Sequence, residues 1–370
     1  KVPWLIDSTL RDGEQAAGVA FSEDDSLEIA RELTAIGINE LEVGTPAMGR
    51  AEIAKMSRIA RTFPKLRTTA WCRAKPSDID AAIASGVSAI HLSFPVSRVH
   101  FAALGKDLHW ALECASALIP SAKTHFGYVS VGAQDASRAS DQDLIRFARH
   151  VRALGVDRLR IADTVGIWNP LACAERVSHL KQAFPDLTIG VHTHNDLGMA
   201  TANAIAAAMA GADSVDVTVN GLGERAGNAA LEEVVMALEV SLGVSTGIRT
   251  EALLALSKRV ARLAGRPLAA AKAVTGSRVF SHESGIHVHA MLRDRRSYEA
   301  FEPERVGHAG REYVLGKHSG TAAMRHLMND CGASSASGEI VSRVAQAGQP
   351  NCDSPTVVGL PDWAPAAIQR

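Results

Sequence analysis

The feature that most constrains this sequence is a regular alternation of short apolar segments with longer segments of helical pattern. Eight runs rich in apolar and β-branched residues recur, at 4–9, 38–44, 66–72, 87–94, 124–131, 157–164, 187–194 and 213–220. Strands that alternate with helices indicate parallel pairing with helical crossovers. Eight such units within about 240 residues predict an α/β fold, a closed (β/α)8 TIM barrel.

The segments between these runs carry the usual signals of helix ends. Helical patterns occupy 22–36, 76–85, 141–154, 170–184 and 197–210. Three segments begin at a capping or helix-starting residue, namely Ser22, Pro76 and Pro170. Several segments end at a glycine, namely Gly37, Gly86, Gly155 and Gly211. The main rival, an open doubly wound sheet, would show a glycine-rich phosphate loop after its first strand. The segment LRDGEQ follows instead and lacks that spacing.

The alternation stops near residue 241, and this divides the chain into three predicted regions. Residues 1–245 are expected to form the catalytic barrel. Residues 246–330 are expected to form a small, mainly helical C-terminal region that includes a lid segment. Residues 331–370 contain a run of small and polar side chains, which predicts a short, partly irregular extension.

The charge balance and the cysteines exclude several classes of function. A formal net charge of -1 gives no overall field that would attract nucleic acid or an acidic membrane. No run approaches the roughly 20 apolar residues of a membrane span. No signal-peptide pattern opens the sequence, so we expect a cytoplasmic protein. The five cysteines are far apart, which argues against a disulfide framework or a cysteine-bound zinc site.

The polar residues that follow the predicted strands point to a metal site. In a TIM barrel the chemistry lies at the carboxyl ends of the strands. His192 and His194 end the seventh strand, and residues two apart on a strand face the same side. Asp12 follows the first strand, which only the eighth separates from the seventh in a closed barrel. Two imidazoles and a carboxylate suit Mn, Fe, Zn or Co, and Asn228 would add a neutral oxygen.

Arg11, next to Asp12, would face an anionic ligand of that metal. A guanidinium offers a planar fork that matches a carboxylate or an enolate oxygen. Two alternatives remain open at this point. Arg11 forms an ion pair with Glu14 or Glu42, or the two histidines bond only to each other.

Three longer motifs carry a family resemblance: STLRDGEQ (8–15), HTHNDLGMATANA (192–204) and NGLGERAGNAALEE (220–233). Over roughly residues 4–325 the chain resembles the DRE-TIM metallolyases, and within them the acyl-transferring synthases that make homocitrate, 2-isopropylmalate or citramalate. Further stretches are similar to the homocitrate synthases of the nitrogen-fixation type: WCR (71–73), LSFPVS (92–97), ADTVG (162–166), FSHESGIHVHAML (280–292), RRSYE (295–299) and LGKHSG (315–320). The chain ends before the regulatory domain of leucine-pathway isopropylmalate synthases, which we therefore expect to be absent.

The resemblance implies a reaction and a set of roles. Acetyl-CoA would condense with 2-oxoglutarate, and thioester hydrolysis would release homocitrate and CoA. A divalent ion (Mn, Mg, Zn, Fe or Co) would be bound by Asp12, His192, His194 and Asn228. Arg11 would stabilise the developing alkoxide, and Gln15 and Thr164 would line the oxo-acid pocket. His287 would act as the base and Tyr298 would help to cover the site, both from the partner chain of a homodimer.

Two positions depart from the family pattern. Gln134 stands where the family carries a glutamate that assists the base, so either Asp135 assists, or His287 works with water, or activity is reduced. Ser130 stands where lysine-pathway homocitrate synthases carry an arginine. The distal carboxylate of the oxo acid must then be bound elsewhere, and Arg73 is the candidate.

Other functions stay open from sequence alone. Within the same fold, the chain would be a 2-isopropylmalate or citramalate synthase acting on another 2-oxo acid. A lyase of the hydroxymethylglutaryl-CoA type would need a cysteine in a glycine-flanked lid loop, and none of the five cysteines has that setting. An iron(II) oxygenase would also use two histidines and a carboxylate, but on an all-β scaffold. Gln134 keeps open a protein that binds metal and oxo acid without catalysis.

Overall fold

The computed structural model describes residues 2–314 and 319. The chain divides into two compact units, residues 1–268 and 269–370. The boundaries placed at 245 and 330 from sequence stay predictions, and the extension 331–370 lies outside the described residues.

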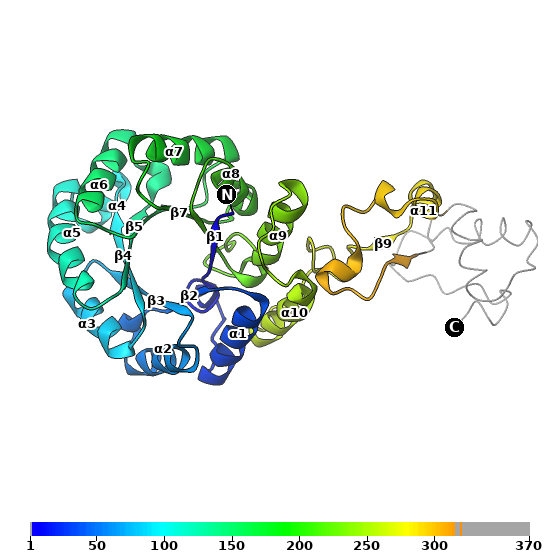
Figure 1. Cartoon of the computed structure of the whole chain (residues 1–370), viewed down its shortest axis with the longest axis horizontal. Helices are drawn as coiled ribbons and strands as arrows, with labels where there is room; N and C mark the ends of the chain where they lie inside the picture. Colours follow the sequence, from blue (N-terminus) through cyan, green and yellow to red (C-terminus); the bar gives the residue numbers. More distant parts are fainter. Residues whose placement is uncertain (1, 315–318, 320–370) are drawn as a thin grey trace, which may run out of the picture. The chain divides into compact units, whose positions relative to one another are not determined.

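The first unit contains the predicted closed barrel of eight parallel strands (Figure 1). The strands are β1 (Trp4–Asp7), β2 (Glu40–Gly44), β3 (Arg67–Arg73), β4 (Ala89–Pro95), β5 (Tyr128–Gln134), β6 (Arg158–Asp163), β7 (Ile189–Thr193) and β8 (Ser214–Val217). Each strand pairs with the next, and β1 closes the ring by pairing with β8, with Trp4 opposite Ser214. The prediction of a (β/α)8 barrel is confirmed.

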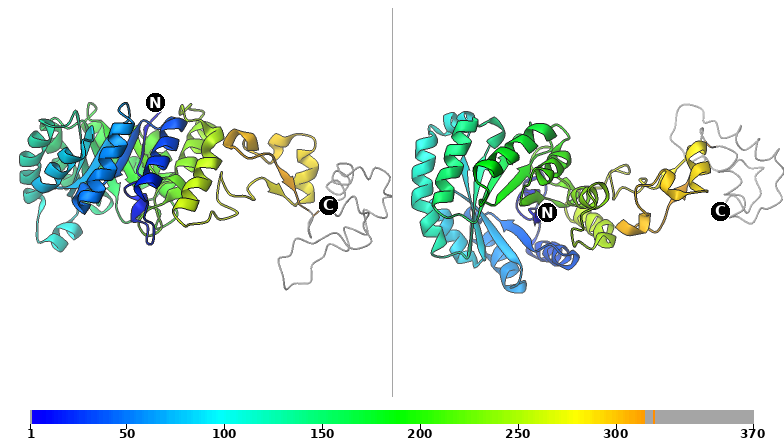
Figure 2. Two further views of the ribbon diagram at one scale, coloured as in Figure 1. Left: turned by 90° about the horizontal axis from the view of Figure 1, so that it is seen from below. Right: turned by 45° about the horizontal axis from the view of Figure 1, so that its top comes forward.

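Helices surround the strands on the outside (Figure 2). They are α1 (Glu23–Ile36), α2 (Arg50–Thr62), α3 (Pro76–Ser85), α4 (Arg98–Leu104), α5 (Leu108–Lys123), α6 (Asp141–Ala153), α7 (Pro170–Ala183), α8 (Ala200–Met209), α9 (Leu231–Met236) and α10 (Leu253–Leu263). The start of α1 shows why the sequence signals were informative: Ser22 and Asp25 form a reciprocal capping box, and Gly37 ends the helix at φ 111°. Within the described residues, no helix combines the length and apolarity of a membrane span.

The interior of the barrel is charged where many TIM barrels are filled by Val, Ile and Leu. Glu40 and Glu42, two apart on β2, both point inward and are fully buried. Arg158 of β6 pairs with Glu40 at 2.6 Å, and Arg160 of β6 pairs with Glu42 at 2.8 Å. Because inward positions alternate along a strand, these pairs form two stacked layers. The apolar core lies instead between the strands and the surrounding helices.

The second unit is described over residues 269–314 and at residue 319. It has the helix α11 (Gly285–Met291) and a parallel pair of short strands, β9 (Ser281–His282) and β10 (Glu312–Tyr313). The ring of His287 stacks on that of Tyr298, with centroids 3.8 Å apart. The predicted helical region after the barrel is therefore present.

Candidate active site

A tight turn after β1 places Arg11 and Asp12 above the carboxyl ends of the strands. The carbonyl of Ser8 accepts hydrogen bonds from the backbone N–H groups of Arg11, Asp12 and Gly13, at 3.1, 2.9 and 3.0 Å. Three donors on one carbonyl fold the chain back over the barrel mouth. Both side chains are buried there, with Asp12 only 2% exposed.

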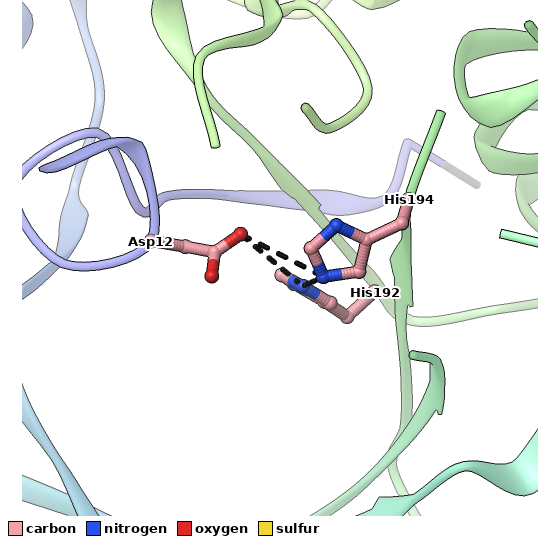
Figure 3. Close-up of side chains that lie close together, drawn as sticks. All are labelled: Asp12, His192 and His194. Atoms are coloured by element: carbon pink, nitrogen blue, oxygen red, sulfur yellow. Dashed lines mark hydrogen bonds and ion pairs between the residues drawn. The ribbon is translucent and has the colours of Figure 1, made fainter. Parts of the chain in front are cut away.

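Asp12, His192 and His194 converge at this mouth (Figure 3). The Nε2 atoms of the two histidines lie 3.2 Å apart, and Asp12 Oδ2 lies 3.7 Å from the first and 3.8 Å from the second. Metal ions of this class are bound at about 2.0–2.2 Å, so two ligands of one ion lie no more than roughly 4.4 Å apart. All three separations meet that limit, and the sequence prediction that these residues come together is confirmed.

The other ring nitrogens fix which atoms are available to a metal. His192 Nδ1 lies 3.0 Å from a carboxylate oxygen of Asp216, and His194 Nδ1 lies 3.2 Å from the carbonyl of Gly227. A carbonyl and a carboxylate can only accept, so we assign a proton to each Nδ1. Each Nε2 then presents a lone pair toward the other. Two lone pairs and a carboxylate that converge in this way form a donor set that a divalent cation would satisfy.

Asn228 completes the donor set. Its Nδ2 donates to Asp12 Oδ2 and to the carbonyl of Leu222. Its Oδ1 is buried and has no hydrogen-bond partner among the described residues, which marks a polar atom that a bound ion would satisfy. The absence of a side chain at Gly223 lets the Asn228 amide lie next to Asp12, because a Cβ at position 223 would collide with that amide and lie 3.1 Å from Asp12 Oδ2.

The electrostatic setting keeps these groups in their metal-binding forms. Burial by itself raises the pKa of the Asp12 carboxyl, but the Arg11 guanidinium, the two neighbouring imidazoles and the hydrogen bond from Asn228 together outweigh burial and hold that pKa below its usual value. Burial lowers the pKa of His194 to about 4, and the neighbouring His192 adds to the shift. Metals bind carboxylate and neutral imidazole, so both shifts favour binding.

Replacing Asp216 by asparagine is expected to weaken divalent-metal affinity by about 10–100-fold. The asparagine keeps the shape but loses the negative charge that orients His192 and makes it a better ligand. Calorimetric titration with Mn²⁺ measures the effect, and thermal unfolding of the metal-free variant shows whether the barrel is intact. An unchanged Mn²⁺ affinity would contradict the role given to Asp216.

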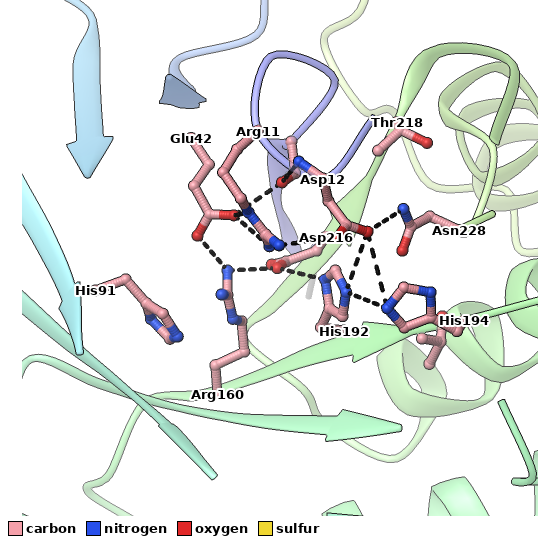
Figure 4. Close-up of polar contacts among 12 residues, drawn as sticks. Arg11, Asp12, Glu42, His91, Arg160, His192, His194, Asp216, Thr218 and Asn228 are labelled. Atoms are coloured by element: carbon pink, nitrogen blue, oxygen red, sulfur yellow. Dashed lines mark hydrogen bonds and ion pairs between the residues drawn. The ribbon is translucent and has the colours of Figure 1, made fainter. Parts of the chain in front are cut away.

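Arg11 is held in place by a network of buried charges (Figure 4). Its Nε donates to Glu42 at 2.6 Å and its Nη1 to Asp12 at 2.9 Å. Glu42 also accepts from Arg160 at 2.8 Å, and Arg160 donates to Asp216 at 2.6 Å. Of the alternatives left open by the sequence, the ion pair with Glu42 is present. It is buried, however, and it orients Arg11 toward the metal-binding residues instead of tying it to the surface.

A cavity of about 200 Å³ opens beside these residues. Its lining is formed by Arg11, Asp12, Gln15, Trp71, His91, Ser93, Gly132, Gln134, Arg160, Ala162, Thr164, His192, His194, Glu224 and Arg225. Gln15 and Thr164 are among these lining residues, and their role in binding the oxo acid stays a prediction. Thr164 Oγ1 accepts a hydrogen bond from the backbone N–H of Asp135.

Arg73 is not brought to this cavity. Its guanidinium forms two hydrogen bonds of 2.9 Å with Asp78, in the first turn of α3, and half of its side chain is exposed. This placement departs from the expectation that Arg73 binds the substrate. His287 and Tyr298 belong to the second unit, and their roles stay predictions.

Asp135 does not replace the missing glutamate at position 134. Gln134 itself lines the cavity. The Asp135 carboxylate instead accepts hydrogen bonds from Ser97 and from Arg138, the latter at 2.9 Å. Of the three alternatives for the base, assistance by Asp135 is the one that this geometry disfavours.

The sequence analysis did not identify His91 as a residue of the site. His91 is 1% exposed and lines the cavity. Its Nδ1 lies 2.9 Å from Ser130 Oγ, and a Cβ at Gly132 would come within 2.5 Å of its Nε2. A signal was available, because His91 and Ser93 lie two apart on one strand and share its inward face.

The fold and the site together define a (β/α)8 barrel with two histidines and one carboxylate at the carboxyl ends of its strands. Residues 2–260 match the family model described as HMGL-like, and residues 274–350 match the model of the homocitrate synthase post-HMGL domain-like family. The chain belongs to the HMGL-like family of enzymes, in the synthase group of the DRE-TIM metallolyases.

Relatives with two different names are about equally similar. The chain is 47% identical to 2-isopropylmalate synthase 2 of Caldanaerobacter subterraneus subsp. tengcongensis, over 90% of this chain and 86% of that protein. It is 46% identical to homocitrate synthase of Frankia alni, over 89% of this chain and 93% of that protein. The hydroxymethylglutaryl-CoA lyase of Pseudomonas aeruginosa shares the fold, with a TM-score of 0.62 and 22% identity over 72% of this chain and 95% of that one.

Proposed function

We propose that this protein is a metal-dependent acyltransferase that condenses acetyl-CoA with a 2-oxo acid. One observation carries the proposal: Asp12, His192 and His194 converge beside Arg11 at the mouth of the barrel. The buried and unpartnered Oδ1 of Asn228 fits a fourth ligand. When bound, a divalent ion of the Mn, Mg, Zn, Fe or Co class polarises a carbonyl oxygen.

The chain's own residues would orient and stabilise the reactants. Arg11 donates hydrogen bonds to Glu42 and Asp12, and its guanidinium carbon lies over the Trp71 ring, 5.5 Å from the ring centroid. The direction of its side chain is therefore fixed before substrate binds. A fixed guanidinium stabilises negative charge that develops on an oxygen without reorganising first. Gln15 and Thr164 supply polar contacts at the rim of the same cavity. Removal of the methyl proton is assigned to His287, and Gln134 cannot accept that proton in its place.

Within this class we favour 2-oxoglutarate as the oxo acid and homocitrate as the product. The support is the polarity of the cavity wall formed by His91, Ser93 and Arg160. Arg160 Nε is buried and has no hydrogen-bond partner among the described residues. A second polar group on the substrate satisfies such a wall, whereas the branched apolar end of 2-oxoisovalerate would leave its donors unpaired.

The test is thiol release from acetyl-CoA, measured in parallel with 2-oxoglutarate, 2-oxoisovalerate and pyruvate. We expect kcat/KM to favour 2-oxoglutarate by about a hundredfold or more. A preference for 2-oxoisovalerate would make the chain a 2-isopropylmalate synthase, and a preference for pyruvate would make it a citramalate synthase. No thiol release with any of the three would overturn the proposed condensation.

We further infer a homodimer in which His287 and Tyr298 of one chain cover the site of the other. The inference rests on the family resemblance. The His192→Ala and His287→Ala variants are each expected to be inactive. Mixing the two variants after mild unfolding should restore part of the activity, because a mixed dimer contains one site with both histidines. If the mixture stays inactive, or if light scattering finds a monomer, the inference is wrong.

A further inference from the structure

A larger cavity, of about 470 Å³, lies at the opposite end of the barrel, where the strands begin. Its polar lining comes from the first residues of several strands: Trp4 of β1, Arg67 of β3, Tyr128 of β5, Arg158 of β6 and Ser214 of β8. We call it the amino-end cavity. The metal-binding residues lie at the other ends of the strands, so this cavity has no part in the proposed condensation.

The amino-end cavity carries an excess positive charge. Arg158 is 1% exposed and donates to both oxygens of Glu40, at 3.1 and 2.6 Å. Arg67 donates to the same carboxylate at 3.1 Å. Two guanidinium groups therefore share one buried carboxylate. Asp213 also lines the cavity, but its charge is balanced by Lys181 at 2.9 Å.

Arg67 is held by aromatic rings and keeps donors available. Its guanidinium carbon lies 4.0 Å from the ring centroid of Tyr128 and 5.5 Å from that of Trp4. Stacking of this kind fixes the plane of the fork. Only Nη1 of Arg67 donates to a protein acceptor within the described part of the chain. The Nε and Nη2 groups remain for a ligand or for water.

Ser214 provides the second, independent indication of a ligand. It is 1% exposed, and among the described residues its hydroxyl has no hydrogen-bond partner. A buried hydroxyl without a partner costs about 1–3 kcal/mol and calls for an explanation. Gly190 brings this hydroxyl next to Arg158, because a Cβ at Gly190 would meet both Ser214 Oγ, at 2.7 Å, and Arg158 Cδ, at 3.2 Å.

We propose that the amino-end cavity binds a small organic carboxylate. A planar carboxylate matches the Nε and Nη2 donors of Arg67, and its oxygens would also accept from the Ser214 hydroxyl. The rest of the lining includes apolar side chains, among them Pro3, Leu5, Ile38 and Ile248, which suit an apolar tail. One net positive charge corresponds to one carboxylate.

The test uses 4-methylpentanoate as the probe and its neutral amide as the matched control ligand. Calorimetric titration of the full chain is expected to show binding of the acid and at least about tenfold weaker binding of the amide. Arg67→Met should weaken binding of the acid by about tenfold or more, because it removes the excess charge. Ser214→Ala should weaken it as well, while leaving the melting temperature of the free protein unchanged or higher, since it removes an unsatisfied hydroxyl.

Ser214→Ala keeps the proposal testable if Arg67→Met fails to fold. His192→Ala serves as the control for the metal site and should bind the acid like the original chain. The proposal is overturned if the acid shows no binding up to about 10 mM, if the amide binds equally well, or if inorganic phosphate binds in place of the acid. It is also overturned if His192→Ala loses the binding while Ser214→Ala and Arg67→Met keep it.

Discussion

Replacing His192 by alanine is expected to abolish divalent-metal binding and to lower thiol release from acetyl-CoA by about a thousandfold or more. His192 Nε2 lies 3.2 Å from His194 Nε2 and 3.7 Å from Asp12 Oδ2, so its loss removes one of three converging donors. Polarisation by a metal is worth several kcal/mol in a transition state, and about 4 kcal/mol corresponds to a factor of a thousand. Metal content after dialysis against Mn²⁺ and the thiol assay measure both effects.

The matched control is His109→Ala. His109 is exposed on α5 and, among the described residues, pairs with Glu113, one helical turn away. Its replacement removes an imidazole without touching the barrel mouth, so metal content and rate should not change. If His192→Ala still binds one equivalent of Mn²⁺, the metal site has been assigned to the wrong residues.

Replacing Gly227 by alanine is expected to destabilise the fold by about 3 kcal/mol and to weaken metal binding together with it. Gly227 has φ 92°, which costs a residue with a Cβ about 1–2 kcal/mol. The added Cβ would also collide with the carbonyl of Gly221, a backbone atom that cannot move aside easily. Such overpacking costs about 1–3 kcal/mol. Urea unfolding and Mn²⁺ titration report the two effects.

The effect on the metal follows from what Gly227 positions. Its carbonyl accepts from His194 Nδ1 at 3.2 Å and from the backbone N–H of Asn195 at 2.9 Å. Gly243→Ala is the control that separates the cost of backbone strain from the cost of the steric clash. Gly243 also has a positive φ, 65°, but there is open space where its Cβ would lie. That variant should lose about 1–2 kcal/mol and keep its metal affinity. Equal losses in the two variants would show that the contact with Gly221 does not matter.

The barrel and the metal-binding residues were predictable because both follow from regular geometry. The alternation of strand and helix patterns is long and repeats eight times, so errors at single boundaries do not alter the fold. A closed ring places the end of β1 near the end of β7, and the period of a strand turns His192 and His194 the same way. Asp12 could then be assigned without knowing any loop conformation.

The residues that bind the rest of the substrate were harder to predict because their positions depend on partners from other elements. By strand period Arg73 should face inward with Trp71, yet Asp78 at the start of α3 draws its guanidinium away. His91 fits at the cavity only because Gly132, on the neighbouring strand, leaves room for its ring. Both outcomes are set by tertiary contacts, which no local pattern encodes.

The two carboxylates of β2 that neutralise Arg158 and Arg160 make this strand unusually intolerant of insertions and deletions. A shift of one residue would turn Glu40 and Glu42 together toward the helices, which would leave Arg158 buried without its counter-charge and Arg160 with Asp216 alone. Substitutions of these glutamates and arginines should therefore be tolerated only when both members of an ion pair across the barrel change together. Among diverging copies of this chain, β2 and β6 would change together while the outer loops vary freely.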